Sequence, residues 1–343
     1  MLLRLFLALS AFSSTAAAAA FSGASMCVLY CYDTRNKSEE GFHIGRIDFA
    51  NQRLEELLSL PPTLQSAGGG VAAGADDGTF FIPNADVAYN ALLEVSLVTN
   101  KTASRTIAAP APFTGVPAFY VVNLDVAADD LVVIFEESSR VAWVAAATVF
   151  PFNGSSRALT PSFASQWVNG FLWRKVGVSA VDSKRGLLYF VGGALPPQPD
   201  HAVLAGIPLA AGPQRPVAFH TLDGVPGTDI DDLAYSAPLD EFVASCFNIS
   251  TGVASIWRAP AGGAGGAEWA QVHAWQRGGE GDMELGNADL SRDGLTFFVA
   301  FMDGATQAPT YFAFDLRKNA LVSKFEVPAG ALPGMLTAEV MAC

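Results

Sequence analysis

The stretch that decides the fold is Asn287-Ala288-Asp289-Leu290-Ser291-Arg292-Asp293-Gly294-Leu295-Thr296-Phe297-Phe298, with its counterpart Ser179-Ala180-Val181-Asp182-Ser183-Lys184-Arg185-Gly186-Leu187-Leu188-Tyr189-Phe190. Each has a short strand-like segment, a tight polar turn that ends in glycine, and a second apolar segment. Glycine suits turns that need a left-handed backbone, and Val, Leu, Tyr and Phe favour strands. Each stretch therefore predicts two strands joined by a tight turn.

The same pattern recurs along the chain at nearly constant spacing. Its turns end at Gly78, Asp130, Gly186, Asp240 and Gly294, at steps of 52, 56, 54 and 54 residues. A further step of 52 back from Gly78 reaches Met26, where the strand-like Cys27-Val28-Leu29-Tyr30 begins. Two more strand-like segments follow each pair, and four strands per unit of about 50 residues are typical of a β-propeller blade.

We therefore predict an all-β protein, a six-bladed β-propeller of residues 21–343 with four antiparallel strands per blade. A β-sandwich, or two separate β domains, remains the alternative. Arg53–Leu58 has helical composition, but its place in the repeat predicts an outer strand. The first repeat lacks an inner strand, so we expect Met335–Ala342 to supply it beside residues 27–32 and close the ring.

The first 20 residues predict a secretory signal peptide. Arg4 is followed by an apolar run from Leu5 to Phe12 and then by small residues up to Ala20. A membrane anchor is the alternative, but the apolar run is too short to span a bilayer. Four Asn-x-Ser/Thr sequons, which begin at Asn36, Asn100, Asn153 and Asn248, fit a secreted glycoprotein with no membrane span.

The cysteines constrain the fold further. Cys27 and Cys31 lie in one predicted strand, about 13 Å apart at ~3.3 Å per residue, too far for a mutual disulfide. One of them needs another partner, for which Cys343 is a candidate. Cys246 lies in an apolar strand and is expected to be a buried thiol.

The charge balance limits the partners. The chain has 33 Asp and Glu against 20 Lys and Arg, a net charge of −13, which makes nucleic-acid binding improbable. The same surplus of carboxylates favours cations such as Ca²⁺, which prefers oxygen ligands. We expect a monomer that binds a small molecule or a protein on a propeller face.

A ring of polar residues is predicted at one mouth of the central channel. Counting back from each turn to the start of the inner strand gives Asn123, Ser179, Asp231 or Asp232, Asn287 and, from the closing strand, Glu339. Their oxygen atoms could form a cage for Ca²⁺. The alternative is a water-filled channel with an ordinary polar lining.

These units resemble the six-bladed propeller superfamily that includes the SMP-30/gluconolactonase, paraoxonase, strictosidine-synthase-like and YWTD groups. The resemblance is carried by Asp231-Asp232-Leu233-Ala234-Tyr235-Ser236 and Ala288-Asp289-Leu290-Ser291-Arg292-Asp293-Gly294-Leu295. The lactonase members have a calcium-binding Asn in a similar turn, where this chain has Asp231 or Asp232. The Glu-Gly-Pro-like first-blade motif and the YWTD tetrapeptide are absent from the sequence.

Two functions follow as hypotheses. The chain has no G-x-S-x-G, H-E-x-x-H or P-loop motif, which favours a non-catalytic extracellular module that recognises a ligand or a protein. The alternative is a calcium-dependent hydrolase of lactone or ester type at the mouth of the channel. There, Ca²⁺ would polarise a carbonyl, and Asp231 or Asp232 would be the carboxylates to examine.

Overall fold

The structure, a computed structural model, describes most of the chain from Ser25 onward. The described residues are 25–32, 41–60, 72–73, 78–84, 91–106, 120–127, 130–138, 143–151, 161–165, 171–194, 202–209, 218–222, 230–248, 251–262, 268–276, 284–302, 308–328 and 335–343. The predicted signal peptide, residues 1–20, lies outside them, as do Asn36 and Asn153.

The described strands form six four-stranded antiparallel sheets, numbered here from 1 to 6. Sheet 1 has the order β24 (Met335–Ala342), β1 (Met26–Tyr32), β2 (His43–Asp48), β3 (Arg53–Ser59). Sheet 2 consists of β4 (Ala72–Ala73), β5 (Thr79–Asn84), β6 (Ala91–Ser96) and β7 (Lys101–Thr106). Sheet 3 consists of β8 (Tyr120–Ala127), β9 (Asp130–Ser138), β10 (Trp143–Pro151) and β11 (Pro161–Ser165).

The other three sheets repeat this order. Sheet 4 consists of β12 (Phe171–Asp182), β13 (Leu187–Ala194), β14 (Ala202–Pro208) and β15 (Ala218–Thr221). Sheet 5 consists of β16 (Ile230–Ser236), β17 (Glu241–Asn248), β18 (Val253–Pro260) and β19 (Ala270–Gln276). Sheet 6 consists of β20 (Glu284–Leu290), β21 (Thr296–Met302), β22 (Pro309–Asp315) and β23 (Ala320–Glu326).

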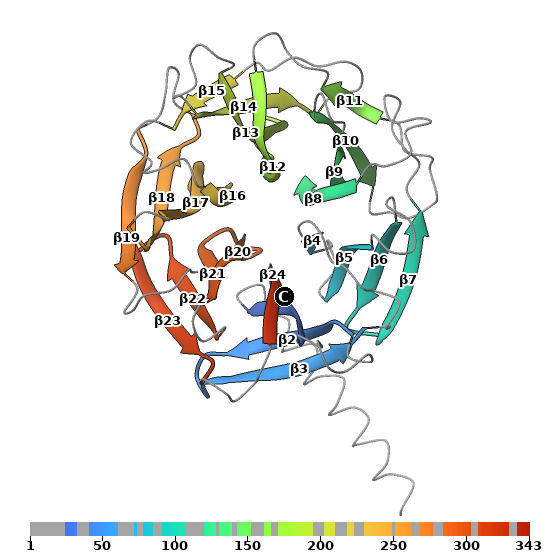
Figure 1. The fold of residues 1–343 in the computed structure, drawn as a ribbon, viewed down its shortest axis with the longest axis vertical. Coiled ribbons are helices and arrows are strands. Elements are labelled where there is room, and N and C mark those ends of the chain that lie inside the picture. The colour runs from blue at the N-terminus through green and yellow to red at the C-terminus, as the bar shows by residue number, and fades with distance from the viewer. Residues whose placement is uncertain are drawn as a thin grey trace, which may run out of the picture.

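The sheets stand around a common centre, as Figure 1 shows, with β4, β8, β12, β16, β20 and β24 innermost. The prediction of an all-β propeller built from antiparallel sheets is therefore confirmed. The segment with helical composition forms the outer strand β3, because its place in the sheet outweighs its local propensity.

The turns between first and second strands confirm the repeat. Gly78, Gly186, Asp240 and Gly294 all have positive φ angles, between 58° and 81°. These are four of the five positions that the sequence marked as equivalent; the fifth, Asp130, is the first residue of β9. Asp240 adopts this conformation without being glycine, which Asp tolerates better than most residues.

Antiparallel pairing gives the ring two different faces. The first strands end and the second strands begin on one face, where the third strands also end and the fourth begin; we call it the turn face. The second strands end and the third strands begin on the opposite face, which we call the loop face. Each inner strand therefore begins at the loop face and ends at the turn face.

The two ends of the described chain close the ring. The C-terminal strand β24 pairs antiparallel with β1, from Met26 opposite Ala342 to Tyr32 opposite Met335. A disulfide joins Cys27 to Cys343 on the turn face. Both the closing strand and the partner of Cys27 are confirmed, and Cys246 is a buried cysteine outside this disulfide.

The hydrophobic core lies between neighbouring sheets. One cluster joins sheets 4 and 5 through Tyr189 and Phe242, and another joins sheets 5 and 6 through Val243 and Phe297. Two more clusters join sheet 1 to sheet 6 and to sheet 2. A missing sheet would therefore expose apolar surface on both of its neighbours.

The two described sequons lie in turns, as predicted. Asn248 ends the second strand of sheet 5, before the turn to β18 on the loop face. Asn100 is exposed in the turn between the third and fourth strands of sheet 2, on the turn face. Among the described residues, no helix is long and apolar enough to cross a membrane.

Candidate functional site at the channel mouth

The structure places the six predicted site residues on inner strands. Asn123 lies on β8, Ser179 on β12, Asp231 and Asp232 on β16, Asn287 on β20 and Glu339 on β24. Five of the six sheets thus contribute to the set. Ser179 is buried, and Asp231 and Asp232 are partly buried. The side chains of the other three lie outside what the structure describes.

A backbone irregularity marks each of these positions. The pairing register shifts just before Asn123 and Ser179, across Asp231 and across Asn287, and next to Glu339. A β-bulge turns the strand locally and changes the direction of its side chains. All five strands therefore depart from regular pairing at the places where the sequence predicted a common site.

The Asp232 carboxylate holds two inner strands together. Its Oδ1 accepts a hydrogen bond from the backbone N–H of Leu233 at 2.8 Å. Its Oδ2 accepts one from the N–H of Ala288, on the inner strand of the next sheet, at 2.8 Å. An inner strand is a sheet edge, and its outward N–H groups lack a strand partner. Asp232 satisfies one of these groups on β20.

The Asp289 carboxylate links two inner strands in the same way, those of sheets 6 and 1. Its Oδ1 accepts from the N–H of Leu290 at 2.7 Å, and its Oδ2 from the N–H of Ala342 on β24 at 2.8 Å. Sheets 5, 6 and 1 are thus linked near the channel by carboxylates that cross from strand to strand. The sequence analysis did not identify this role of Asp289, because it depends on which residue faces it from the next sheet.

The calcium site stays a prediction. Among the side chains that the structure describes, no group of three or more His, Cys, Asp or Glu residues could hold a metal ion. Each Asp232 oxygen already accepts one backbone hydrogen bond, although a carboxylate oxygen has a second lone pair to offer. The described part of the set fits a polar channel lining held by hydrogen bonds.

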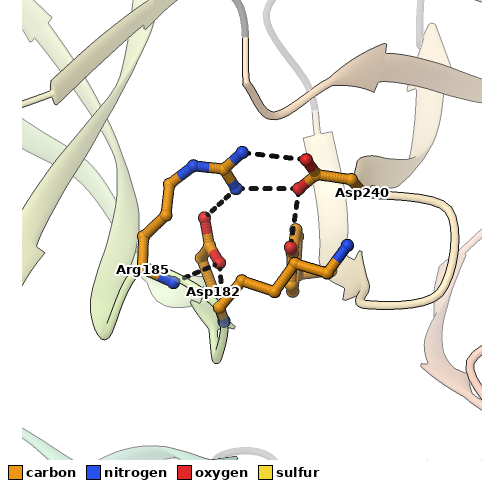
Figure 2. Close-up of polar contacts among 5 residues, drawn as sticks. Asp182, Arg185 and Asp240 are labelled. Atoms are coloured by element: carbon orange, nitrogen blue, oxygen red, sulfur yellow. Dashed lines mark hydrogen bonds and ion pairs between the residues drawn. The ribbon is translucent and has the colours of Figure 1, made fainter.

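A second polar cluster links sheets 4 and 5 on the turn face (Figure 2). Arg185 follows β12, and its Nη1 donates to Asp182 at 2.6 Å and to Asp240 at 2.8 Å. Its Nη2 donates to the other oxygen of Asp240 at 2.9 Å. Asp240 also accepts from the Tyr235 hydroxyl at 2.7 Å. We call these four residues the turn-face clamp.

The clamp controls the ionisation of its members. Hydrogen bonds from Arg185, and secondly from Tyr235, hold the pKa of Asp240 well below its usual range. Burial and the bond to Asp240 raise the pKa of Tyr235. Asp182 is fully buried, and its Oδ1 accepts the backbone N–H groups of Lys184 and Arg185. Asp240 thus stays ionised near neutral pH, the Tyr235 hydroxyl keeps its proton, and the clamp joins two sheets.

Similar links follow around the turn face. The Ser236 hydroxyl donates to the carbonyl of Gly294 at 2.6 Å, which joins sheets 5 and 6. Arg258 of sheet 5 donates to the carbonyl of Leu316 in sheet 6 at 2.7 Å. Gln52 of sheet 1 donates to the carbonyl of Lys324 in sheet 6 at 2.9 Å. Three further side-chain hydrogen bonds therefore hold sheet 6 to sheets 5 and 1 at this face.

Of the three histidines that the structure describes, two have structural surroundings and one is an exception. His220 is 3% exposed and packs between the rings of Tyr189 and Phe242. Its Nδ1 is buried and has no hydrogen-bond partner. Burial, and secondly Arg185, lower the pKa of His220. His273 packs against Trp275 and Phe314, and His201 lies outside the described residues.

The exception is His43, which has polar neighbours at the loop face. Its Nδ1 lies 3.2 Å from the Ser59 hydroxyl and 3.4 Å from Glu56 Oε1. Ser59 donates to Glu56 Oε1 at 2.8 Å. A pairing irregularity in β3, described below, brings these groups together, and no motif in the sequence announces it.

Comparisons with known proteins give a fold likeness without a family. No protein-family model matches the chain, and no curated protein matches it. A chain of the crystal structure of the nidogen/laminin complex is 13% identical, with a TM-score of 0.47, and the match covers 93% of this chain and 98% of that one.

Two other solved structures are similar at the same level. A hypothetical selenium-binding protein from Sulfolobus tokodaii is 9% identical, with a TM-score of 0.48, over 88% of this chain and 74% of that one. A prolyl endopeptidase is 13% identical, with a TM-score of 0.41, over 92% of this chain but only 43% of that one. At such identities these likenesses concern the fold alone.

Proposed function

We propose that this chain is a secreted, glycosylated, six-bladed β-propeller that recognises a small molecule or a protein with its loop face. The observation that carries the proposal is the ring of register shifts in the inner strands of sheets 1, 3, 4, 5 and 6. At or next to each shift lies a polar residue of the predicted set, on the strand that lines the centre of the ring. Convergent polar groups from several sheets are what a ligand site needs to fix orientation.

The lengths of the connections also favour the loop face. In the sequence, 12 residues separate β3 from β4, 13 separate β7 from β8 and 10 separate β1 from β2, and these strand ends lie on the loop face. The turn face has the short turns 183–186 and 237–240. Binding residues concentrate on longer loops that a rigid scaffold positions. The turn face, fastened by the clamp and the other links between sheets, supplies that rigidity.

Recognition is favoured over the calcium-dependent hydrolase of lactone or ester type. The hydrolase would need Asp231 or Asp232 to bind the metal or to activate water. Both oxygens of Asp232 instead accept backbone hydrogen bonds that hold neighbouring strands. A carboxylate that accepts backbone hydrogen bonds from two strands supports a binding scaffold more directly than it supports acid–base chemistry.

Secretion is supported by covalent chemistry. The Cys27–Cys343 disulfide forms readily in oxidising compartments and is rare in the cytosol. Asn100 is exposed in a turn and Asn248 is partly exposed at the end of β17, so a glycan could occupy either site without entering the core. Both features fit the predicted signal peptide.

The test uses untagged protein secreted from eukaryotic cells, labelled and presented as multimers to intact cells and to extracellular matrix. In a Cys31→Ser background, a polyethylene glycol chain is attached to Cys introduced at Thr251 or at Lys318. Thr251 is exposed on the loop face, and Lys318 is exposed on the turn face. We expect modification at Thr251 to block binding and modification at Lys318 to leave it unchanged.

Two results would contradict the proposal. Protein retained inside the cell with residues 1–20 still attached, as read by mass spectrometry, would remove the extracellular setting. Binding blocked only by the Lys318 adduct would assign recognition to the turn face. The unmodified Thr251→Cys and Lys318→Cys proteins control for effects of the substitutions themselves.

A further inference from the structure

We propose that His43 and Glu56 form a zinc-binding site on the loop face of sheet 1. Tyr30, His43 and Ser59 lie directly opposite one another on β1, β2 and β3, so they form a row across three strands. The row lies near the loop-face end of the sheet, because His43 begins β2 and Ser59 ends β3. The proposal does not depend on the recognition function.

A β-bulge brings Glu56 into this row. In a regular strand, residues three apart point to opposite faces of the sheet, so Glu56 and Ser59 would be separated. The register shifts by one residue at Leu57, since Ile44 pairs with Leu58 and Gly45 with Glu56. Bulges re-aim side chains in this way and are frequent next to functional sites. Glu56 and Ser59 consequently lie on the same side as His43.

Gly45 leaves room for the ring of Tyr30, the residue of the row on β1. A Cβ atom at Gly45 would lie 3.0 Å from Tyr30 Cε1, so a larger residue would crowd the tyrosine ring. Tyr30 stacks on His43, with ring centroids 5.3 Å apart, and its hydroxyl donates to Glu56 Oε2 at 3.3 Å. The ring of His43 and the carboxylate of Glu56 are thus both held in place, as supporting contacts do around metal ligands.

The geometry does not fit a catalytic triad. Ser59 Oγ and Glu56 Oε1 both approach the same histidine nitrogen, Nδ1. In a triad the carboxylate orients the histidine through one nitrogen while the serine contacts the other. The cluster therefore lacks the relay that would activate Ser59 as a nucleophile.

The spacing does fit two ligands of one metal ion. His43 Nδ1 and Glu56 Oε1 are 3.4 Å apart. Two ligands at about 2.0–2.2 Å from a tetrahedral Zn²⁺ are separated by roughly the same distance. Ser59 donates a hydrogen bond to Glu56 Oε1, which favours the ionised carboxylate that a metal ligand must be.

The site is open on its outer side. The side chain of Glu56 is 47% exposed, whereas that of His43 is 15% exposed. Two protein ligands leave two positions of a tetrahedral ion to water or to a ligand that reaches the loop face, and Ser59 can hydrogen-bond a bound water. Zinc with two protein ligands should bind weakly and reversibly, in contrast to a four-ligand structural site.

The test titrates ZnCl₂ into untagged, chelator-treated, full-length secreted protein by calorimetry, with Co²⁺ absorption as a second readout. We expect one zinc ion per chain, with affinity at least tenfold weaker in His43→Gln and in Glu56→Gln. His273→Gln, which removes a histidine of sheet 5, should bind as the wild type does.

Zinc affinity unchanged in both variants, or no binding at millimolar zinc, would overturn the proposal. Thermal unfolding in the absence of zinc shows whether each variant is folded. X-ray absorption at the zinc edge of the wild-type protein requires no variant. It should report one imidazole and otherwise oxygen ligands, and a sulfur ligand would assign the zinc to a cysteine instead.

Discussion

Cys27 and Cys343 are 316 residues apart in the sequence, and the disulfide between them places their Cα atoms 5.5 Å apart. It lies at the end of the ladder that β24 forms with β1, where the N–H of Cys343 also donates to the carbonyl of Ser25. The covalent bond and the strand pairing therefore close the same seam of the ring.

Removal of the disulfide should destabilise the fold without changing it. We expect Cys343→Ser to lower the free energy of unfolding by roughly 2–5 kcal/mol, because the bond closes a long loop in the unfolded chain. Denaturant unfolding of the secreted protein measures this loss. Cys31→Ser, at a partly exposed cysteine outside the disulfide, is the control. Equal midpoints for wild type and Cys343→Ser would contradict the covalent closure.

Deletion of the closing strand should have a larger effect. A chain truncated before Met335 loses the whole ladder with β1 and the burial of Val340 and Met341. Each ladder hydrogen bond contributes about 1 kcal/mol net, and the buried side chains contribute about 1.5–3 kcal/mol each. Together these losses rival the roughly 5–15 kcal/mol that stabilises a typical domain. Truncation should abolish secretion, and a truncated chain that melts like the full one would refute the closure.

The turn-face clamp predicts a loss of stability in acid. Because the pKa of Asp240 is lower in the folded protein than its usual 3.8, its stabilising effect is complete above that value. The effect is lost as the pH falls through and below about 4. The Asp240→Asn variant should therefore have a lower free energy of unfolding than the wild type at pH 7. Between pH 5 and pH 3, its free energy of unfolding should fall by less than that of the wild type.

Chemical denaturation at a series of pH values measures this difference. Glu326→Gln is the matched control, because Glu326 is 62% exposed on the outer strand β23, away from the clamp. Parallel pH profiles for the wild type and Asp240→Asn would show that the clamp does not link sheets 4 and 5 energetically.

His220 predicts a second pH dependence at higher pH. The pKa of His220 is lower in the folded protein than in the unfolded chain. The contribution of His220 to the free energy of unfolding is therefore complete above the unfolded pKa of about 6.5 and declines as the pH falls below it. The charged groups nearby act in opposite directions: Arg185 disfavours the imidazolium, and Asp182 favours it. Acidification from pH 7 to pH 5 should therefore weaken the contact between sheets 4 and 5.

His220→Phe tests this expectation because it keeps an aromatic ring between Tyr189 and Phe242. The variant should lose less stability than the wild type between pH 7 and pH 5. At pH 8, where the imidazole is neutral in both states, the difference between the two proteins reports the substitution alone. An identical slope in the two profiles would exclude His220 as the group that titrates.

The predicted calcium site has a test that separates it from the structural role of Asp232. If Ca²⁺ binds at the channel mouth, millimolar calcium should raise the melting temperature of the wild type by mass action. Asp232→Asn should then abolish the calcium-dependent rise. If Asp232 only accepts the backbone hydrogen bonds described above, Asp232→Asn lowers the melting temperature equally with calcium and with chelator. Metal analysis of the purified protein gives an independent answer.

The sequence by itself determined the repeating architecture. Turn-ending positions such as Gly186 and Gly294 recur every 52–56 residues, and the left-handed backbone at these two glycines is a local property of the chain. The missing first strand indicated that Met335–Ala342 closes the ring, and strand geometry excluded a Cys27–Cys31 disulfide. These inferences needed only local propensity, periodicity and the reach of an extended chain.

Only the tertiary structure decided what the polar side chains do. Asp232 accepts from Ala288, and Arg185 contacts Asp240, across sheets whose relative register no local pattern encodes. Likewise, one extra residue at Leu57 places Glu56 beside His43. The reason is the two-residue period of a strand: a shift of one residue sends a side chain to the other face of the sheet. The contacts of these groups therefore depend on where bulges fall and how sheets meet, which are properties of the assembled ring.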